Sequence, residues 1–128
     1  MNSAQKSLVE KLGIKPEYCI TIINPPEGFE DKLGDLPDSV RVENFLEEVE
    51  FDLINYFAET RADLEQQFEY LKNCLNKDGA LWVSWQKSES KGDLSEDSVK
   101  EVGESSGLVS KTTCDLDGEW CATKFSFK

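Results

Sequence analysis

Two apolar runs separated by an amphipathic segment form the clearest pattern in this chain. Residues 51–57 (FDLINYF) and 80–85 (ALWVSW) are almost continuously apolar, which is typical of strands buried on both faces of a sheet. Between them the sequence predicts a helix over 61–76, with Thr60 as its N-cap. Its apolar side chains recur at helical spacing: Leu64, Phe68, Leu71 and Leu75. The stretch therefore predicts a parallel β-α-β unit.

Further strands and helices are predicted on both sides of this unit. The remaining strands are expected at 18–23, 40–43, 108–116 and 120–127, and the remaining helices at 3–12, 27–33 and 95–106. Asp93 or Ser95 caps the last helix. This order predicts a single α/β domain over residues 1–128. We expect a mostly parallel sheet of about six strands in three layers, with helices on both faces and an antiparallel hairpin at the C-terminal end.

The C-terminal hairpin makes a specific prediction about two cysteines. Asp117-Gly118 is a strong signal for a two-residue turn. That turn pairs Cys114 with Cys121 at a Cα separation of about 5.5 Å, which permits a disulfide. We favour the alternative of two reduced, buried thiols. The same register pairs Lys111 with Lys124, so that face must be solvated or the register must differ.

Charge and composition exclude several classes of function. The chain has 26 acidic and 14 basic residues, a net charge of −12, which disfavours binding to nucleic acid or to an anionic membrane surface. A protein partner is allowed. The absence of histidine and of any C-x-x-C pair argues against a Ser-His nucleophile and against a metal site. No apolar run suits a signal peptide or a membrane span, so we expect a cytosolic protein.

Two sets of motifs resemble known families. The strand order, together with FDLI at 51–54 and LNKDGALWV at 75–83, resembles the Rossmann fold of S-adenosylmethionine-dependent methyltransferases. Four further stretches resemble an uncharacterised family of short bacterial proteins with a degenerate form of that fold. They are LGIKP (12–16), NPPEGF (24–29), TRADLE (60–65) and GALWVSW (79–85). This resemblance implies the fold and brings no activity with it.

The chain departs from the methyltransferase pattern around the expected cofactor site. A methyltransferase follows its first strand with a glycine-rich turn, whereas this chain has Asn24-Pro25-Pro26, and proline adds bulk and removes an amide donor. We therefore expect no cofactor, and the two prolines disfavour S-adenosylmethionine. Glu43 stands where the family places an acid for the ribose hydroxyls, although we favour a solvated carboxylate. Only seven residues separate Glu43 from Phe51, so the family's third strand and a helix are missing.

Any ligand site is expected beyond the carboxyl ends of the parallel strands. The candidate residues there are Asn24, Gly28, Glu43, Arg61, Trp85 and Lys87. Trp85 could stack on a planar ligand, while Arg61 and Lys87 could hold an anion near the helix start at Thr60. The simpler interpretations are packing for Trp85, a solvated loop for Lys87 and capping for Thr60.

Three functional hypotheses follow, in order of preference. The first is a non-catalytic methyltransferase-like scaffold that acts as a protein-interaction or regulatory module. The second is a protein or methyltransferase that binds S-adenosylmethionine or a nucleotide in a changed pose, through Glu43 and Trp85. The third is an acidic inhibitor or immunity-type protein with a basic partner. The oligomeric state stays open, because an exposed edge at 40–43 or at the hairpin could pair with a second copy.

Overall fold

The computed structural model describes residues 12–24, 29, 39–43, 50–86, 95–115 and 120–127. The strands are β1 (Cys19–Ile23), β2 (Arg41–Glu43), β3 (Phe51–Phe57), β4 (Leu75–Gln86), β5 (Leu108–Asp115) and β6 (Trp120–Phe127). The helices are α3 (Arg61–Asn73) and α4 (Glu96–Ser105). The predicted helices at 3–12 and 27–33 fall outside the described residues except for Leu12 and Phe29.

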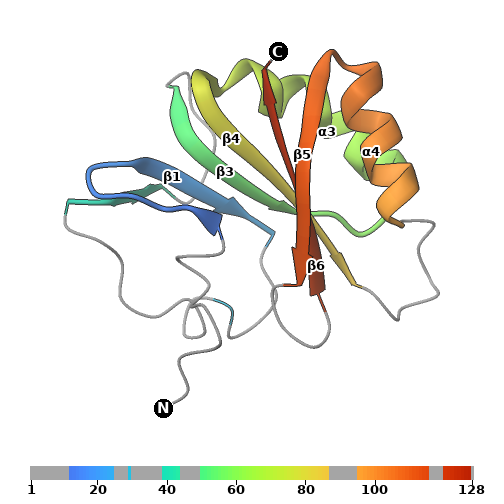
Figure 1. Cartoon of the computed structure of the whole chain (residues 1–128), viewed down its shortest axis with the longest axis horizontal. Coiled ribbons are helices and arrows are strands. Elements are labelled where there is room, and N and C mark those ends of the chain that lie inside the picture. The colour runs from blue at the N-terminus through green and yellow to red at the C-terminus, as the bar shows by residue number, and fades with distance from the viewer. Residues whose placement is uncertain are drawn as a thin grey trace.

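All six strands form one sheet in the order β2-β1-β3-β4-β6-β5 (Figure 1). The first four strands are parallel, whereas β6 is antiparallel to both β4 and β5. The predicted α/β sheet with a C-terminal antiparallel hairpin is therefore confirmed. The short strand β2 and the hairpin strand β5 form its two edges.

The two faces of the sheet bury different sets of side chains. Both described helices pack on one face, which we call the helix face (Figure 1). Its core includes Ile54, Tyr56, Leu81, Val83, Trp85 and Phe125 from the sheet, with Leu64, Phe68, Val99 and Val102 from the helices. The opposite side, which we call the second face, buries Ile20, Ile22, Leu53, Phe57, Trp82 and Ala122 under Leu12, Ile14 and Phe29. Period-2 alternation along each strand assigns these residues to the two sides.

Helix α3 starts where the sequence predicts and ends earlier. The Thr60 hydroxyl oxygen accepts a hydrogen bond from the Asp63 N–H at 3.1 Å, which confirms Thr60 as the N-cap. The helix ends at Asn73, and β4 already begins at Leu75 instead of Ala80. The register of β4 against β3 shifts there, between Phe51 and Leu53. A Cβ atom on Gly79 would lie 2.8 Å from the Asp52 carbonyl oxygen. The predicted stop signal at 76–79 is thus an irregularity within the strand, where the backbones approach too closely for any residue but glycine.

Helix α4 is fixed by its cap and by one close contact with the sheet. Ser95 is the N-cap, and its side chain and that of Ser98 each accept a hydrogen bond from the other's backbone N–H. Gly103 faces the ring of Phe125, and a Cβ atom at Gly103 would lie 2.1 Å from that ring. The helix therefore lies on β6 more closely than any side chain would allow. At its C-terminal end, the Lys72 ammonium donates to the Ser106 carbonyl at 2.6 Å.

The predicted register of the hairpin is wrong near its turn. Cys114 pairs with Ala122, and Cys121 pairs with Asp115, so the two thiols lie on opposite faces of the sheet. The cause is a register shift between Ser110 and Thr112, which leaves Lys111 without a partner across the ladder. The bulge removes the predicted contact between Lys111 and Lys124, because Thr112 takes its place. It also removes the geometry that a Cys114–Cys121 bridge requires.

Candidate functional site

The strand order reverses between β1 and β3. The chain passes from β1 to β2 on one side and then returns to β3 on the other side of β1. In open α/β sheets, ligands bind in the crevice outside the carboxyl ends of the strands at such a point. Ile23 pairs with Tyr56 at the ends of these strands, so the crevice would lie between the residues that follow, Asn24 and Phe57.

Asn24 ties the two strand ends together. Its backbone is left-handed, with φ of 60°, a conformation that asparagine tolerates better than most residues other than glycine. Its side-chain Nδ2 donates to the Phe57 carbonyl oxygen at 3.0 Å. Of the predicted site residues, Asn24 therefore lies at the switch point. A ligand in this crevice would compete with a hydrogen bond that the protein already makes.

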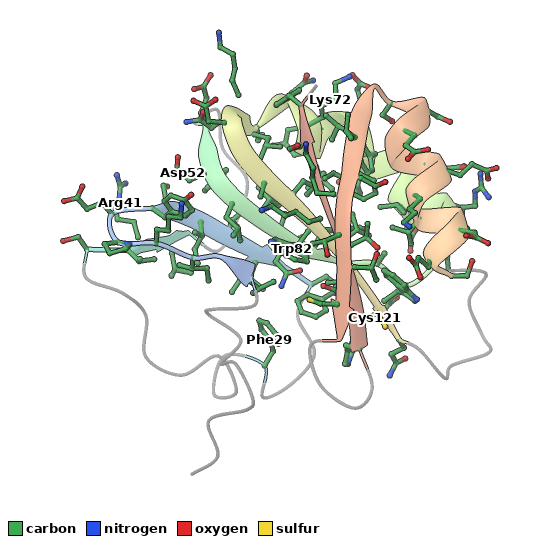
Figure 2. All side chains as sticks on the ribbon, viewed as in Figure 1. Phe29, Arg41, Asp52, Lys72, Trp82 and Cys121 are labelled. Carbon is green, nitrogen blue, oxygen red and sulfur yellow. The ribbon has the colours of Figure 1, made fainter. Side chains whose placement is uncertain are left out.

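An aromatic cluster borders the same end of the second face. The rings of Phe29 and Phe57 lie 4.8 Å apart at an interplanar angle of 70°, and those of Phe57 and Trp120 lie 5.0 Å apart at 81°. Such edge-to-face contacts suit the ring quadrupoles. Figure 2 shows the Phe29 side chain reaching the sheet from the side opposite the helices. Sequence reasoning missed this cluster, because its members come from three separate segments.

The start of helix α3 offers little to an anion. The Arg61 guanidinium donates to Glu65 Oε2 at 2.9 Å and pairs with Glu101 Oε1 at 2.8 Å. These hydrogen bonds to carboxylates raise the pKa of Arg61 above its usual value. The predicted anion-binding cation is thus engaged with two carboxylates of its own chain. Thr60 uses its side chain as the cap of this helix.

The electrostatics around Tyr56 point the same way. Its side chain is 6% exposed on the helix face, close to the first turn of α3. Burial raises the pKa of the Tyr56 hydroxyl, and the negative charges of Asp63 and Glu59 raise it further. Two carboxylates therefore lie near enough to the Tyr56 hydroxyl to disfavour a further negative charge there.

Among the remaining predicted site residues, the structure describes the side chain of Trp85. Trp85 is 4% exposed and packs in the core of the helix face, so its ring is not available to stack on a ligand from solvent. Glu43 lies in β2, and its backbone pairs with Thr21 of β1. The Glu43 side chain, Gly28 and Lys87 lie outside the described residues.

Two polar side chains lie buried on the second face, and sequence reasoning missed both. Asn55 and Ser84 are each 0% exposed, and Ser84 Oγ donates to Asn55 Oδ1 at 2.8 Å. Both residues occur within runs that read as apolar strands. The only sequence signal was a polar residue in the second half of each run, Asn55 in 51–57 and Ser84 in 80–85.

Neither metal binding nor a membrane span is indicated in the described part of the chain. There, no three side chains of the histidine, cysteine, aspartate and glutamate types gather closely enough to hold a metal ion. No described helix combines the length and the apolar character needed to cross a bilayer.

Comparison with solved structures identifies the fold. The chain has the Rossmann-like fold of S-adenosylmethionine-dependent methyltransferases, and solved structures of that class superpose on almost all of it. A methyltransferase from Aquifex aeolicus has a TM-score of 0.64 at 15% identity, over 92% of this chain and 86% of that one. A TehB-like methyltransferase from Corynebacterium glutamicum has a TM-score of 0.61 at 16% identity, over 94% and 85%. Magnesium protoporphyrin IX methyltransferase from Synechocystis, solved with bound SAM, has a TM-score of 0.60 at 8% identity, over 94% and 74%.

The sequence places the chain in a particular family. It belongs to the family described as "Protein of unknown function (DUF3052)", whose profile matches residues 10–128. No curated protein matches the chain. The predicted membership of an uncharacterised family with a methyltransferase-like fold is therefore confirmed. At these identities, the similarity to solved methyltransferases extends to the fold alone.

Proposed function

We propose that this domain is a non-catalytic methyltransferase-like module that acts by contact with another protein. The observation that carries the proposal is the hydrogen bond from Asn24 Nδ2 to the Phe57 carbonyl oxygen. It spans the switch point where a ligand would enter and uses the carbonyl group that such a ligand would meet. In the sequence, Asn24 is followed by two prolines, which have no amide hydrogen to offer a ligand.

Two further observations support a crevice without a cofactor. Arg61 is paired with Glu65 and Glu101, so a bound anion would have to replace two carboxylates. Trp85 is buried under the helices and leaves no stacking surface at the end of β4. A module of this kind needs a partner, and we expect that partner to be a protein. We expect the two proteins to meet in the cytosol.

The second candidate function is binding of S-adenosylmethionine or a nucleotide in a changed pose. Its support is the fold, since one similar structure holds SAM and the switch point between β1 and β3 is retained here. Glu43, on the neighbouring strand β2, would contact the ribose hydroxyls in that case.

Isothermal titration calorimetry with S-adenosylmethionine and S-adenosylhomocysteine separates the two functions. For the wild-type chain we expect no saturable heat at millimolar ligand. The Asn24→Gly variant keeps the left-handed backbone accessible and removes the bridging side chain, so it tests whether that bond closes the crevice. Micromolar binding by the wild type that disappears in Glu43→Ala would overturn the non-catalytic proposal.

A further inference from the structure

The side-chain amide of Asn55 is buried, and only one of its two polar atoms has a hydrogen-bond partner in the described structure. The residue lies in β3 between Ile22 of β1 and Trp82 of β4, and it is 0% exposed. Its Oδ1 accepts the Ser84 hydroxyl at 2.8 Å, whereas its Nδ2 has no acceptor in the described structure. A buried donor without an acceptor costs about 1–3 kcal/mol of stability.

This arrangement has no apparent value for the stability of the sheet. The flanking residues Ile22 and Trp82 are apolar and buried, and a leucine, which has the same branched shape as asparagine, would occupy the Asn55 position without an unpaired donor. Replacing both members of a buried polar pair by apolar groups is often neutral or stabilising. Buried polar groups that violate the local pattern in this way occur at functional sites.

Alternation along β3 directs Asn55 to the second face, on the same side as Phe57. Phe57 is in edge contact with Phe29 and Trp120. Ser84 pairs with Phe57 in the ladder, so the amide and the hydroxyl group lie on the same side of the sheet as this aromatic cluster, close to the carboxyl end of β3. Apolar walls with a few convergent polar groups are the usual lining of a small-molecule site.

We propose that Asn55 and Ser84 are the polar floor of a binding site for a neutral, planar ligand, and that the Phe29 ring occupies this site when it is empty. A carboxamide offers a donor and an acceptor side by side, so the matching edge carries both, as in a primary amide or a nucleobase. The ligand is neutral because the apolar surroundings would penalise an unpaired charge. This site goes beyond the proposed scaffold function, because it makes the module responsive to a small molecule.

The direct test follows the Asn55 side-chain NH₂ group by NMR in the ¹⁵N-labelled chain. Its signals are identified by their absence from the spectrum of the Asn55→Leu variant. The matched probes are nicotinamide, a neutral primary amide, and nicotinate, in which a carboxylate replaces that amide; adenine represents the nucleobases. We expect saturable shifts of the Asn55 signals with nicotinamide or adenine, with a Kd on the order of 1 mM for fragments of this size, and none with nicotinate.

Two variants show whether the site is built as proposed. Phe29→Ala removes the ring that fills the site, so it should lower the Kd at least fivefold. The double variant Asn55→Leu with Ser84→Ala should melt at the wild-type temperature or above it, and should show no saturable shift of the Phe57 backbone amide with the same probes. If the double variant keeps its melting temperature, its loss of binding does not result from a loss of folding.

Three results would overturn the proposal. They are the absence of saturable shifts with nicotinamide and adenine in both the wild type and Phe29→Ala, an equal response to nicotinate, and unchanged binding in the double variant. The scaffold proposal is tested separately, by titration with S-adenosylmethionine. Whether or not that ligand binds, the Asn55 signals can still be measured with nicotinamide and adenine.

Discussion

The two faces of this sheet are built on different principles. The helix face is closed by regular elements, α3 and α4, whose apolar side chains interlock with those of β3, β4 and β6. The second face is covered, within the described residues, by Leu12, Ile14 and Phe29, and it contains the buried amide of Asn55. The helix face therefore has the more regular cover, and the second face holds a buried donor that lacks an acceptor in the described structure.

The difference between the two faces bears on where a functional site can lie. Close packing on the helix face tolerates few substitutions, because the side chains of its core are buried in one cluster. The Asn55 Nδ2 donor, which has no acceptor in the described structure, lies on the second face, and the Asn24 bridge lies at the strand ends. Of the candidate residues from the sequence, Trp85 and Arg61 belong to the packed side and its surface, whereas Asn24 lies at the strand ends.

The largest expected effect comes from truncating the core of the helix face. Phe68 is 1% exposed and contacts Phe125 edge-on, with ring centroids 5.7 Å apart. We expect Phe68→Ala to lower the free energy of unfolding by about 3–5 kcal/mol, because it leaves a cavity. Urea denaturation measures this loss. Tyr70→Ala is the matched control on the same helix, since Tyr70 is 48% exposed, and it should change stability by less than about 0.5 kcal/mol.

The next effect tests how closely α4 approaches the sheet. A Cβ atom at Gly103 would lie 2.1 Å from the Phe125 ring, so Gly103→Ala must push the helix or the ring away. We expect a net loss of about 2 kcal/mol from overpacking, despite the better helix propensity of alanine. Ser105→Ala, at an exposed position of the same helix, is the control for propensity. If Gly103→Ala proved as stable as the wild type, the contact between α4 and β6 would be looser than described.

A smaller effect concerns the bridge at the switch point. Asn24→Gly should cost about 1 kcal/mol, because it removes the hydrogen bond to the Phe57 carbonyl. Asn24→Ala should cost about 2 kcal/mol, because alanine also pays for the left-handed backbone at φ of 60°. Thermal unfolding of the two variants beside the wild type gives both values. Equal stability of all three chains would show that the bridge contributes nothing.

The smallest effect appears only in alkaline solution. Burial and the charges of Asp63 and Glu59 raise the pKa of Tyr56 above its ordinary value of 10.0. The unfolded chain therefore loses this proton first, so the Tyr56 contribution to stability is complete below pH 10 and is lost as the pH rises through the folded-state pKa. Tyr56→Phe should unfold with a weaker dependence on pH above pH 10. Denaturation curves from pH 9 to pH 11 compare the two slopes, and identical slopes would exclude this role for Tyr56.

Local signals predicted most of the fold. The apolar runs became β1, β3 and β4, and the caps Thr60 and Ser95 start the helices α3 and α4. These features depend on residues within a few positions of one another, which is why one sequence suffices. The errors arose where distant backbone intervened. Helix α3 ends early because β4 begins at Leu75, and the hairpin register shifts at Lys111 because the ladder bulges there.

The candidate site was less predictable, because contacts across the sheet decide it. From the sequence, Asn24 was a candidate without a partner, and only the parallel pairing of β1 with β3 brings its amide to Phe57. The sequence does not show that the Arg61 guanidinium pairs with Glu101 of α4, because the two residues lie far apart in the chain. Whether a polar side chain binds a ligand or satisfies the fold depends on neighbours that the chain order does not reveal.

Local sequence patterns were enough to predict the strands, the helix starts and the class of fold, because apolar periodicity and capping act over a few residues. The tertiary structure sets which side of the sheet each residue joins, since one shifted residue in a strand reverses its side. It separated Cys114 from Cys121, buried Trp85 and left the Asn55 amide without an acceptor. Those outcomes depend on how strands far apart in the chain pair, which local pattern does not encode.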